Sequence, residues 1–282
     1  MIKDRRVGLN LGIVNPSLWL PLAELADRVG IESVWVPEHL VLPVTMSGSP
    51  AAGEEHPPIP PSVPVFDTFV YMGLMAGRTT RLRFGTNVYN IGLRHPFVTA
   101  RAAATADVVS NGRVDLGVGS SWMVQEWEAT GLDFHTRGAR VNEAIEICQR
   151  LWSEPVVEHH GQFFDFQPVM FEPKPVQVGG PPIHVGGDAP ASLRRAVRFA
   201  KGWMPLNTHL DELPAAVERL AQMCEDAGRT DQIEVSYPVQ VNQESDFDRY
   251  ADHGIDRLLI NPWTSSKTAL ASTEAFAEKY LR

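Results

Sequence analysis

His39 is the histidine whose position best suits acid–base chemistry, because it lies two residues after the end of the apolar run Ser33–Pro37. Histidine titrates near neutral pH, so it can donate a proton, accept one or hydrogen-bond a developing oxyanion. A histidine at the start of a loop can equally do no more than cap the local backbone, and spacing alone favours that structural role. Glu38 stands beside it but would point to the other side of an extended strand, so the two need not form a dyad.

Two glycine-containing turns could bind a phosphate group. Gly117-Val118-Gly119 begins like a dinucleotide-binding fingerprint, but Trp122 stands where the third glycine should be. Ser120-Ser121 could still present hydroxyl and backbone N–H groups to a phosphate there. Gly186-Gly187-Asp188 forms the second turn and opens a predicted helix, whose N-terminus would attract an anion. Strand-to-helix turns that bind no ligand explain both patterns equally well.

Patterns typical of metal sites and of two large hydrolase classes are missing. His159-His160 has no third ligand at a standard spacing, so we expect solvated loop histidines and no metal site. The sequence has neither a G-x-S-x-G elbow nor a Walker lysine loop. Cys148 and Cys224 fall on apolar faces of predicted helices and are expected to be buried free thiols.

Charge and composition restrict the class of partner. The 282 residues include 25 Lys+Arg and 34 Asp+Glu, and the net charge of −9 disfavours nucleic acid and anionic lipid. No apolar run approaches the roughly 18 residues of a membrane span, and the first residues lack an apolar signal segment. We therefore expect a cytoplasmic protein with a small-molecule substrate and with neither nucleic acid nor membrane as partner.

Short β-branched runs alternate with segments of helical period along the whole chain, which predicts eight strand–helix units. Because doubly wound sheets usually have about five to six strands, this repeat favours a single α/β domain over residues 1–282, a closed TIM (β/α)8 barrel. The predicted strands are Val7–Ile13, Ser33–Pro37, Leu82–Val88, Val114–Val118, Ile183–Gly186, Gly202–Pro205, Glu234–Val239 and Arg257–Ile260. The predicted helices are Leu18–Val29, Pro96–Ser110, Arg137–Trp152, Ala191–Ala200, Leu213–Ala227 and Thr268–Leu281.

Two segments do not fit the repeat and are expected to be irregular insertion loops. Leu42–Pro64 contains seven prolines, and Glu154–Pro182 contains a candidate hairpin around His160-Gly161-Gln162. Long irregular loops in a compact domain are usually functional or mobile.

Chemistry in such barrels occurs where strands end and the following loops begin. Amides, hydroxyls and aromatic groups predominate there, which predicts a site for a large, flat, hydrogen-bonding ligand with one or two proton-transfer groups. Trp122, Trp263 and Tyr89 could line such a pocket or equally be core or interface residues. The residues at the predicted strand ends are Asn10, Asn15, Glu38, His39, Asn87, Tyr89, Asn90, Ser120, Ser121, Trp122, Gly186, Gly187, Asp188, Asn207, Gln240, Asn242, Asn261 and Trp263.

Several segments together resemble the bacterial luciferase-like monooxygenase superfamily, particularly its short deazaflavin-dependent oxidoreductases. The resemblance extends nearly end to end, and the order and spacing of its parts make it specific. The matching segments are 30–39, 80–88, 107–119, Glu126 with Gly131, 137–152, and 183–187 with the later Gly202-Trp203. The departures are mostly in loops that would face the pocket.

The resemblance implies a flavin or deazaflavin ring bound at the carboxyl ends of the strands. It places a non-prolyl cis peptide at Asn87–Val88, in a bulge that supports the ring, and it raises His39 to the preferred catalytic residue. The residues expected to bind the cofactor by this resemblance are Glu38, Asn87, Val88, Asn90, Ser120, Ser121, Trp122, Gly186, Gly187 and Asp188.

The resemblance leaves two cofactors to choose between. Members that use coenzyme F420 transfer a hydride between the ring and a substrate carbon, whereas members that use FMN activate oxygen with a separate reductase. The short chain and the turn 186–190 favour F420, with FMN as the alternative and a non-catalytic flavin-binding barrel as a third reading. A homodimer is also implied.

Overall fold

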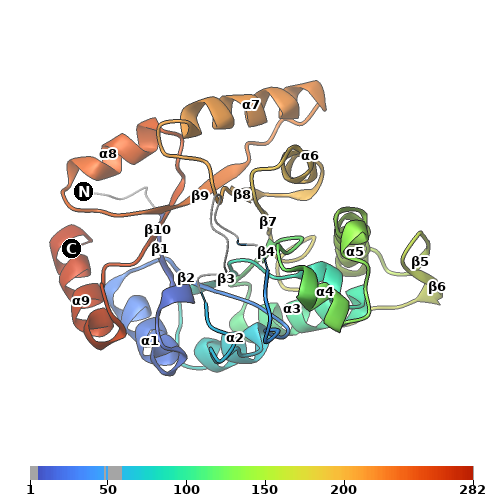
Figure 1. Ribbon diagram of the computed structural model, residues 1–282, viewed down its shortest axis with the longest axis horizontal. Helices are drawn as coiled ribbons and strands as arrows, with labels where there is room; N and C mark the ends of the chain where they lie inside the picture. The colour runs from blue at the N-terminus through green and yellow to red at the C-terminus, as the bar shows by residue number, and fades with distance from the viewer. Residues whose placement is uncertain (1–5, 48, 50–58, 282) are drawn as a thin grey trace.

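The structure, a computed structural model, describes residues 6–47, 49 and 59–281. Eight parallel strands close into a barrel in the order β1-β10-β9-β8-β7-β4-β3-β2, with helices around it (Figure 1). This confirms the predicted α/β class and (β/α)8 barrel. The strands are β1 (Arg6–Asn10), β2 (Ser33–Val36), β3 (Arg83–Thr86), β4 (Val114–Val118), β7 (Ile183–Gly186), β8 (Gly202–Met204), β9 (Glu234–Val239) and β10 (Arg257–Ile260).

The first strand is shorter than predicted. β1 ends at Asn10, and Leu11–Ile13 forms a 3-10 turn, so the predicted extension to Ile13 is wrong. The side chain of Asn10 accepts a hydrogen bond from the backbone N–H of Gly12 and so caps this turn. An apolar run alone does not distinguish a strand from the turn that follows it.

All six predicted helices are present, and three shorter helices were not predicted. α2 is apolar on nearly every side and α4 has only six residues, so neither shows a helical stripe. The helices are α1 (Trp19–Val29), α2 (Thr68–Ala76), α3 (Pro96–Ser110), α4 (Val124–Ala129), α5 (Arg137–Ser153), α6 (Pro190–Phe199), α7 (Leu213–Asp226), α8 (Ser245–Asp252) and α9 (Ala269–Tyr280). The 3-10 turns are Leu11–Ile13, Pro16–Leu18, Ile91–Leu93, Phe134–Thr136 and Ser266–Thr268.

The predicted hairpin is confirmed. β5 (Val157–His160) and β6 (Asp165–Val169) pair antiparallel and project beyond α5, at the right of Figure 1. The expectation of solvated histidines is wrong for His159, whose side chain is 12% exposed and lies 3.2 Å from Glu143. In the other irregular segment, 42–64, the described residues form neither helix nor strand, and 48 and 50–58 lie outside the described part.

A tryptophan fills the barrel interior beneath the carboxyl ends of the strands. Trp35 packs there with Met204 and Leu259. A Cβ atom on Gly85, in the neighbouring strand β3, would lie 2.3 Å from the Trp35 ring, so only glycine leaves room for it. Gly85 in one strand and Trp35 in the next therefore fit together and fill the barrel interior with a packed core.

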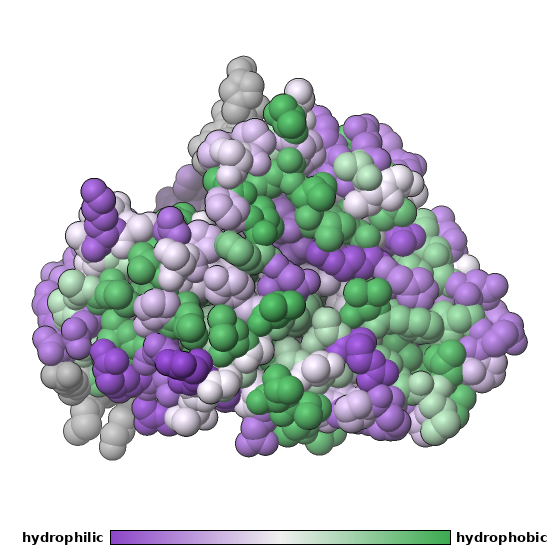
Figure 2. Space-filling view, turned by 90° about the horizontal axis from the view of Figure 1, so that it is seen from below, coloured by the Kyte–Doolittle hydropathy of each residue, from purple (hydrophilic) through white to green (hydrophobic). Residues whose placement is uncertain are grey.

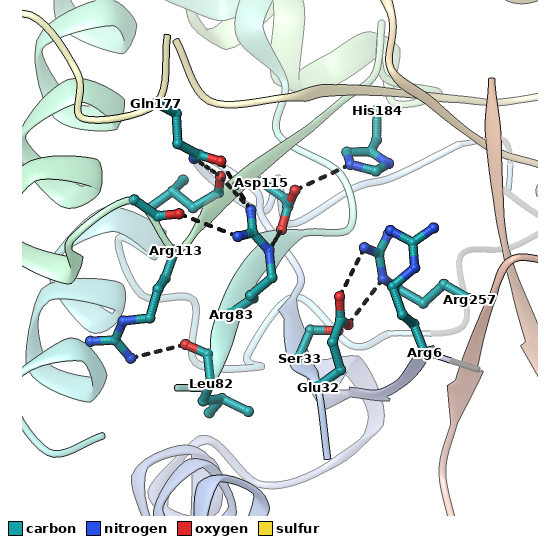
Figure 3. Close-up of polar contacts among 12 residues, drawn as sticks. Arg6, Glu32, Ser33, Leu82, Arg83, Arg113, Asp115, Gln177, His184 and Arg257 are labelled. Carbon is teal, nitrogen blue, oxygen red and sulfur yellow. Dashed lines mark hydrogen bonds and ion pairs between the residues drawn. The ribbon is translucent and has the colours of Figure 1, made fainter. Parts of the chain in front are cut away.

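The opposite, amino-terminal half of the barrel contains a buried polar cluster (Figure 3). The Asp115 carboxylate lies 2.8 Å from Arg83 Nε and 3.4 Å from His184 Nε2. Arg257 pairs with Glu32 at 3.1 Å in the same region. Although burial acts to raise the pKa of Asp115, the hydrogen bonds and charges of His184 and Arg83 hold it below its usual range. These groups lie at the strand starts, where they support the fold rather than the mouth of the barrel.

We expect Asp115→Asn to lower the free energy of unfolding by about 3–5 kcal/mol at neutral pH, because it leaves the Arg83 guanidinium without its carboxylate partner. The lowered pKa means that the carboxylate stabilises the fold above its ordinary pKa of about 3.9, and that this contribution is lost as the pH falls further. Urea unfolding at pH 7 and pH 3 measures the difference between variant and wild type. That difference should shrink at pH 3, while the exposed control Glu218→Gln should match wild type at both. A deficit of equal size at both pH values would contradict the electrostatic origin.

Candidate active site

The carboxyl ends of the strands surround a cavity of about 660 Å³. That volume is within the usual range of small-molecule sites, about 300–1,000 Å³. The structure brings to this cavity every residue that the family resemblance assigned to the site, namely Glu38, His39, Asn87, Val88, Asn90, Ser120, Ser121, Trp122, Gly186, Gly187 and Asp188. Their individual roles stay predictions. Of the other polar residues predicted at strand ends, Asn10 and Asn207 also line it, whereas Asn15, Gln240, Asn242 and Asn261 do not.

Glu38 and His39 diverge after β2, as the alternation of an extended chain predicts. The buried Glu38 carboxylate accepts a 2.6 Å hydrogen bond from Arg94 and a 2.8 Å bond from the backbone N–H of Asn90. Burial raises the pKa of Glu38, and the charge of Arg94 opposes that increase. Glu38 therefore stabilises the segment after β3, and the acidic partner of His39 is a different residue.

That partner is Glu126, which lies in the first turn of α4 and is fully buried. Its Oε2 lies 3.2 Å from His39 Nδ1, and 3.4 Å from both Asn90 Nδ2 and Ser121 Oγ. Its Oε1 accepts a 2.7 Å hydrogen bond from the backbone N–H of Leu40. One carboxylate thus connects the loops that follow β2, β3 and β4. Sequence reasoning included Glu126 only as part of the family resemblance and assigned it no role.

The contact with Glu126 determines how His39 can act. A carboxylate only accepts hydrogen bonds, so its partner Nδ1 is assigned the proton. His39 Nε2 forms no hydrogen bond with any residue that the structure describes. The ring lines the cavity and meets the edge of Trp122 at a centroid distance of 6.0 Å. Nε2 can therefore exchange a proton with a molecule in the cavity.

The segment after β3 forms an apolar floor for the cavity. The peptide bond between Asn87 and Val88 is cis, which confirms the position predicted for it. Val88 packs against the cluster of Trp35, Met204 and Leu259. A Cβ atom on Gly119 would lie 2.6 Å from Val88, and one on Gly186 would lie 3.0 Å from it. Two glycines, Gly119 directly after β4 and Gly186 at the end of β7, therefore make the space that Val88 occupies.

The turn after β7 is hydrogen-bonded to the segment that follows β8. Gly187 has a left-handed backbone (φ +99°), and its N–H donates to the Met204 carbonyl at 3.0 Å. The Asp188 carboxylate accepts a 2.8 Å bond from the backbone N–H of Asn207 and a 2.6 Å bond from Thr208 Oγ1. Asp188 thereby holds the loop after β8 against this side of the cavity.

Comparison with known proteins shows which family the chain belongs to. The sequence model described as luciferase-like monooxygenase matches residues 11–271. The chain belongs to this family. An uncharacterized protein of Mycobacterium tuberculosis is 31% identical over 276 residues, 94% of this chain and 95% of that protein. An F420-dependent glucose-6-phosphate dehydrogenase of Amycolatopsis mediterranei is 31% identical over 225 residues, 75% of this chain and 62% of that one. The crystal structure of monooxygenase RslO1 from Streptomyces bottropensis shares the fold, with a TM-score of 0.76, 23% identity and 98% of both chains covered.

The aromatic residues at the mouth of this luciferase-like barrel have different surroundings. Trp122 lines the cavity, whereas Tyr89 and Trp263 are buried in the hydrophobic core. Burial raises the pKa of Tyr89 to about 12, so its hydroxyl stays protonated at neutral pH. Of the three candidates, Trp122 is the one in position to touch a ligand.

Within 6–47, 49 and 59–281, no three His, Cys, Asp or Glu side chains are grouped so that they could hold a metal ion. Across the same described ranges of this luciferase-like chain, no helix has the length and hydropathy needed to cross a bilayer. The two cysteines are free and buried, as predicted.

Proposed function

We propose that the protein is a coenzyme F420-dependent oxidoreductase that transfers a hydride between the deazaflavin and a small organic substrate. The observation that carries this proposal is the His39–Glu126 contact at the cavity wall, with Nε2 of His39 left for a ligand. Family membership supports an oxidoreductase in general, and the choice of F420 is the finer part of the proposal.

The residues present fit a flat heterocycle with polar edges. Val88, Met204 and Leu259 provide an apolar floor, on which a ring system can lie without losing hydrogen bonds. Amide and hydroxyl side chains that could bind the ring edges and the phosphate tail surround this floor: Asn87, Asn90, Ser120, Ser121, Ser192 and Asn207. When bound, F420 would supply the carbon that accepts or donates the hydride.

Residues of the chain itself would accept and return the proton that accompanies the hydride. As a hydride leaves a substrate C–H bond, the hydroxyl on that carbon gives its proton to His39 Nε2, and in the reverse direction Nε2 returns it to the carbonyl oxygen. Glu126 holds the imidazole ring in place and stabilises its protonated form. Atoms and charge balance, because the hydride and the proton together make up the two hydrogens exchanged.

The preference for F420 rests on two lines of support. The F420-dependent relative of Amycolatopsis mediterranei is 31% identical over 75% of this chain. The chain of 282 residues is also short, as the resemblance to deazaflavin-dependent members implies.

The alternative is an FMN-dependent monooxygenase that receives reduced flavin from a separate reductase. The matched family model is named for monooxygenases, and the similar structure RslO1 is a monooxygenase. The same floor and amide edges suit an isoalloxazine ring. The described lining residues, which are mostly apolar, amide and hydroxyl side chains, suit either ring system.

Cofactor titration separates the two functions. The purified protein is titrated with F420 and with FMN, and the dissociation constants are measured by fluorescence quenching. We expect F420 to bind more tightly and reduced F420 to be oxidised anaerobically when a substrate is present. Tight FMN binding without a response to F420, together with oxygen consumption, would establish the alternative instead.

Three expectations stay predictions: the homodimer, the cytoplasmic location and the lack of a nucleic-acid partner.

Figure 2 shows hydrophobic side chains distributed over the face of the molecule that lies below the view of Figure 1. Exposed apolar residues occur on helices, including Val70 on α2, at 71% exposure, and Val98 on α3, at 57%. Sedimentation velocity would determine whether the chain dimerises.

A further inference from the structure

The cavity has a polar side and an apolar side. The amide and hydroxyl groups proposed to hold the cofactor come mainly from the segments after β3, β4, β7 and β8. The loops after β1 and β2 line another part of the cavity mainly with apolar side chains, which we call the apolar wall: Val14, Trp19, Leu42, Val63, Val65 and Phe66. A ligand lying against this wall exchanges water for hydrocarbon and aromatic contacts.

The described residues that line the cavity include no lysine and no arginine. The whole sequence from 29 to 77, which holds the loop after β2, contains neither residue type. Apart from His39, the ionisable side chains among the described lining residues are the acids Glu38 and Asp188. Arg94 lies behind the cavity and is already paired with Glu38 at 2.6 Å.

An anionic substrate would therefore be poorly accommodated at the apolar wall. A phosphate or carboxylate there would lose its hydration without gaining a basic partner, and burial of an unpaired charge costs several kcal/mol. The phosphate of the cofactor does not share this problem, because hydroxyls and the start of α6 lie on its side of the cavity.

We infer that the substrate is a neutral, mainly hydrophobic molecule whose body lies against the apolar wall and whose single hydroxyl or carbonyl group meets His39. This inference rests on the proposed function for the hydride step, but the character of the wall is independent of which cofactor binds. It also separates this chain from its F420-dependent glucose-6-phosphate dehydrogenase relative, whose named substrate carries a phosphate.

The test uses two probes with one aromatic skeleton, neutral 1-anilinonaphthalene and anionic 8-anilino-1-naphthalenesulfonate. Equilibrium dialysis measures how each binds to the full-length protein, both saturated with whichever of F420 or FMN it binds and without cofactor. We expect the neutral probe to bind at least about 10-fold more tightly than the sulfonate, because the charge finds no partner. A sulfonate that binds as tightly as the neutral amine would overturn the inference.

Two lysine variants locate the binding. Val65 lies on the apolar wall and is 38% exposed, so Val65→Lys can fold while placing a cation there. It should reduce the neutral-over-anionic preference by about 5-fold or more. Val70→Lys, on the exposed side of α2, is the matched control and should leave the preference unchanged. Equal behaviour of the two variants would show that the probes do not contact this wall and would overturn the inference.

The same samples separate the two proposals. If neither F420 nor FMN binds but the probe preference and its response to Val65→Lys persist, the proposed function fails and the apolar substrate site stands. If a cofactor binds and supports turnover but the preference is absent, the proposed function stands and the substrate class is wrong.

Discussion

Replacing His39 with alanine is expected to slow hydride transfer by about 10²–10⁴-fold, the usual contribution of one positioned acid–base group. The effect follows from the geometry at the cavity wall. Nδ1 is held by Glu126, so Nε2 is the ring atom that can exchange a proton with the substrate. Anaerobic stopped-flow absorbance of the deazaflavin under single-turnover conditions measures the rate.

Two further measurements make the His39 result specific. The dissociation constant of the cofactor should change little, because the apolar floor and the amide edges are untouched. His160→Ala is the matched control, since this exposed histidine lies on the hairpin and pairs with Asp165. If His39→Ala and His160→Ala transferred hydride equally fast, the acid–base role of His39 would be wrong.

Replacing Glu126 with glutamine is expected to have the second largest effect. Glutamine keeps the size of the side chain but puts an NH2 group where one oxygen accepted hydrogen bonds. The NH2 group must then face either the Leu40 N–H or the N–H of the His39 ring. In both cases two hydrogen-bond donors meet at one contact. We expect a loss of about 1–3 kcal/mol in the free energy of unfolding and a hydride-transfer rate at least about 10-fold lower, because a hydrogen bond to the second ring nitrogen fixes which one carries the proton.

A spectroscopic measurement distinguishes positioning from general destabilisation. The ¹⁵N signals of the His39 imidazole should indicate the Nδ1–H tautomer in the wild type and a mixture in Glu126→Gln. Glu128→Gln, an exposed change in the same helix, is the control and should leave rate, stability and signals unchanged. A Glu126→Gln protein with wild-type imidazole signals and a wild-type rate would contradict the assigned role.

The barrel itself could be predicted because its causes are local. α5 shows a regular apolar stripe, and buried parallel strands such as β10 are apolar on consecutive residues. α2 was not predicted, because it is apolar on nearly all sides and therefore shows no apolar stripe. Strand ends were less certain, as β1 shows, because the hydrogen bond that turns the chain at Asn10 involves a single side chain.

The location of the site could also be predicted, because parallel strands in a closed barrel bring their carboxyl ends together. Once polar residues are assigned to those ends, topology alone places Asn87, Ser120 and Gly186 around one cavity. The cis peptide at Asn87–Val88 was predicted by resemblance rather than by any local pattern, and the structure contains it.

The pairing of the site residues was decided only by the tertiary structure. His39 and Glu126 are 87 positions apart, and Glu38 and Arg94 are 56 apart. The sequence determined that polar groups stand at strand ends above an apolar barrel, because side-chain alternation and hydrophobic periodicity act over a few residues. Which carboxylate meets which base depended on how separate loops pack against one another, and no periodicity within a single segment specifies a contact across the mouth of the barrel.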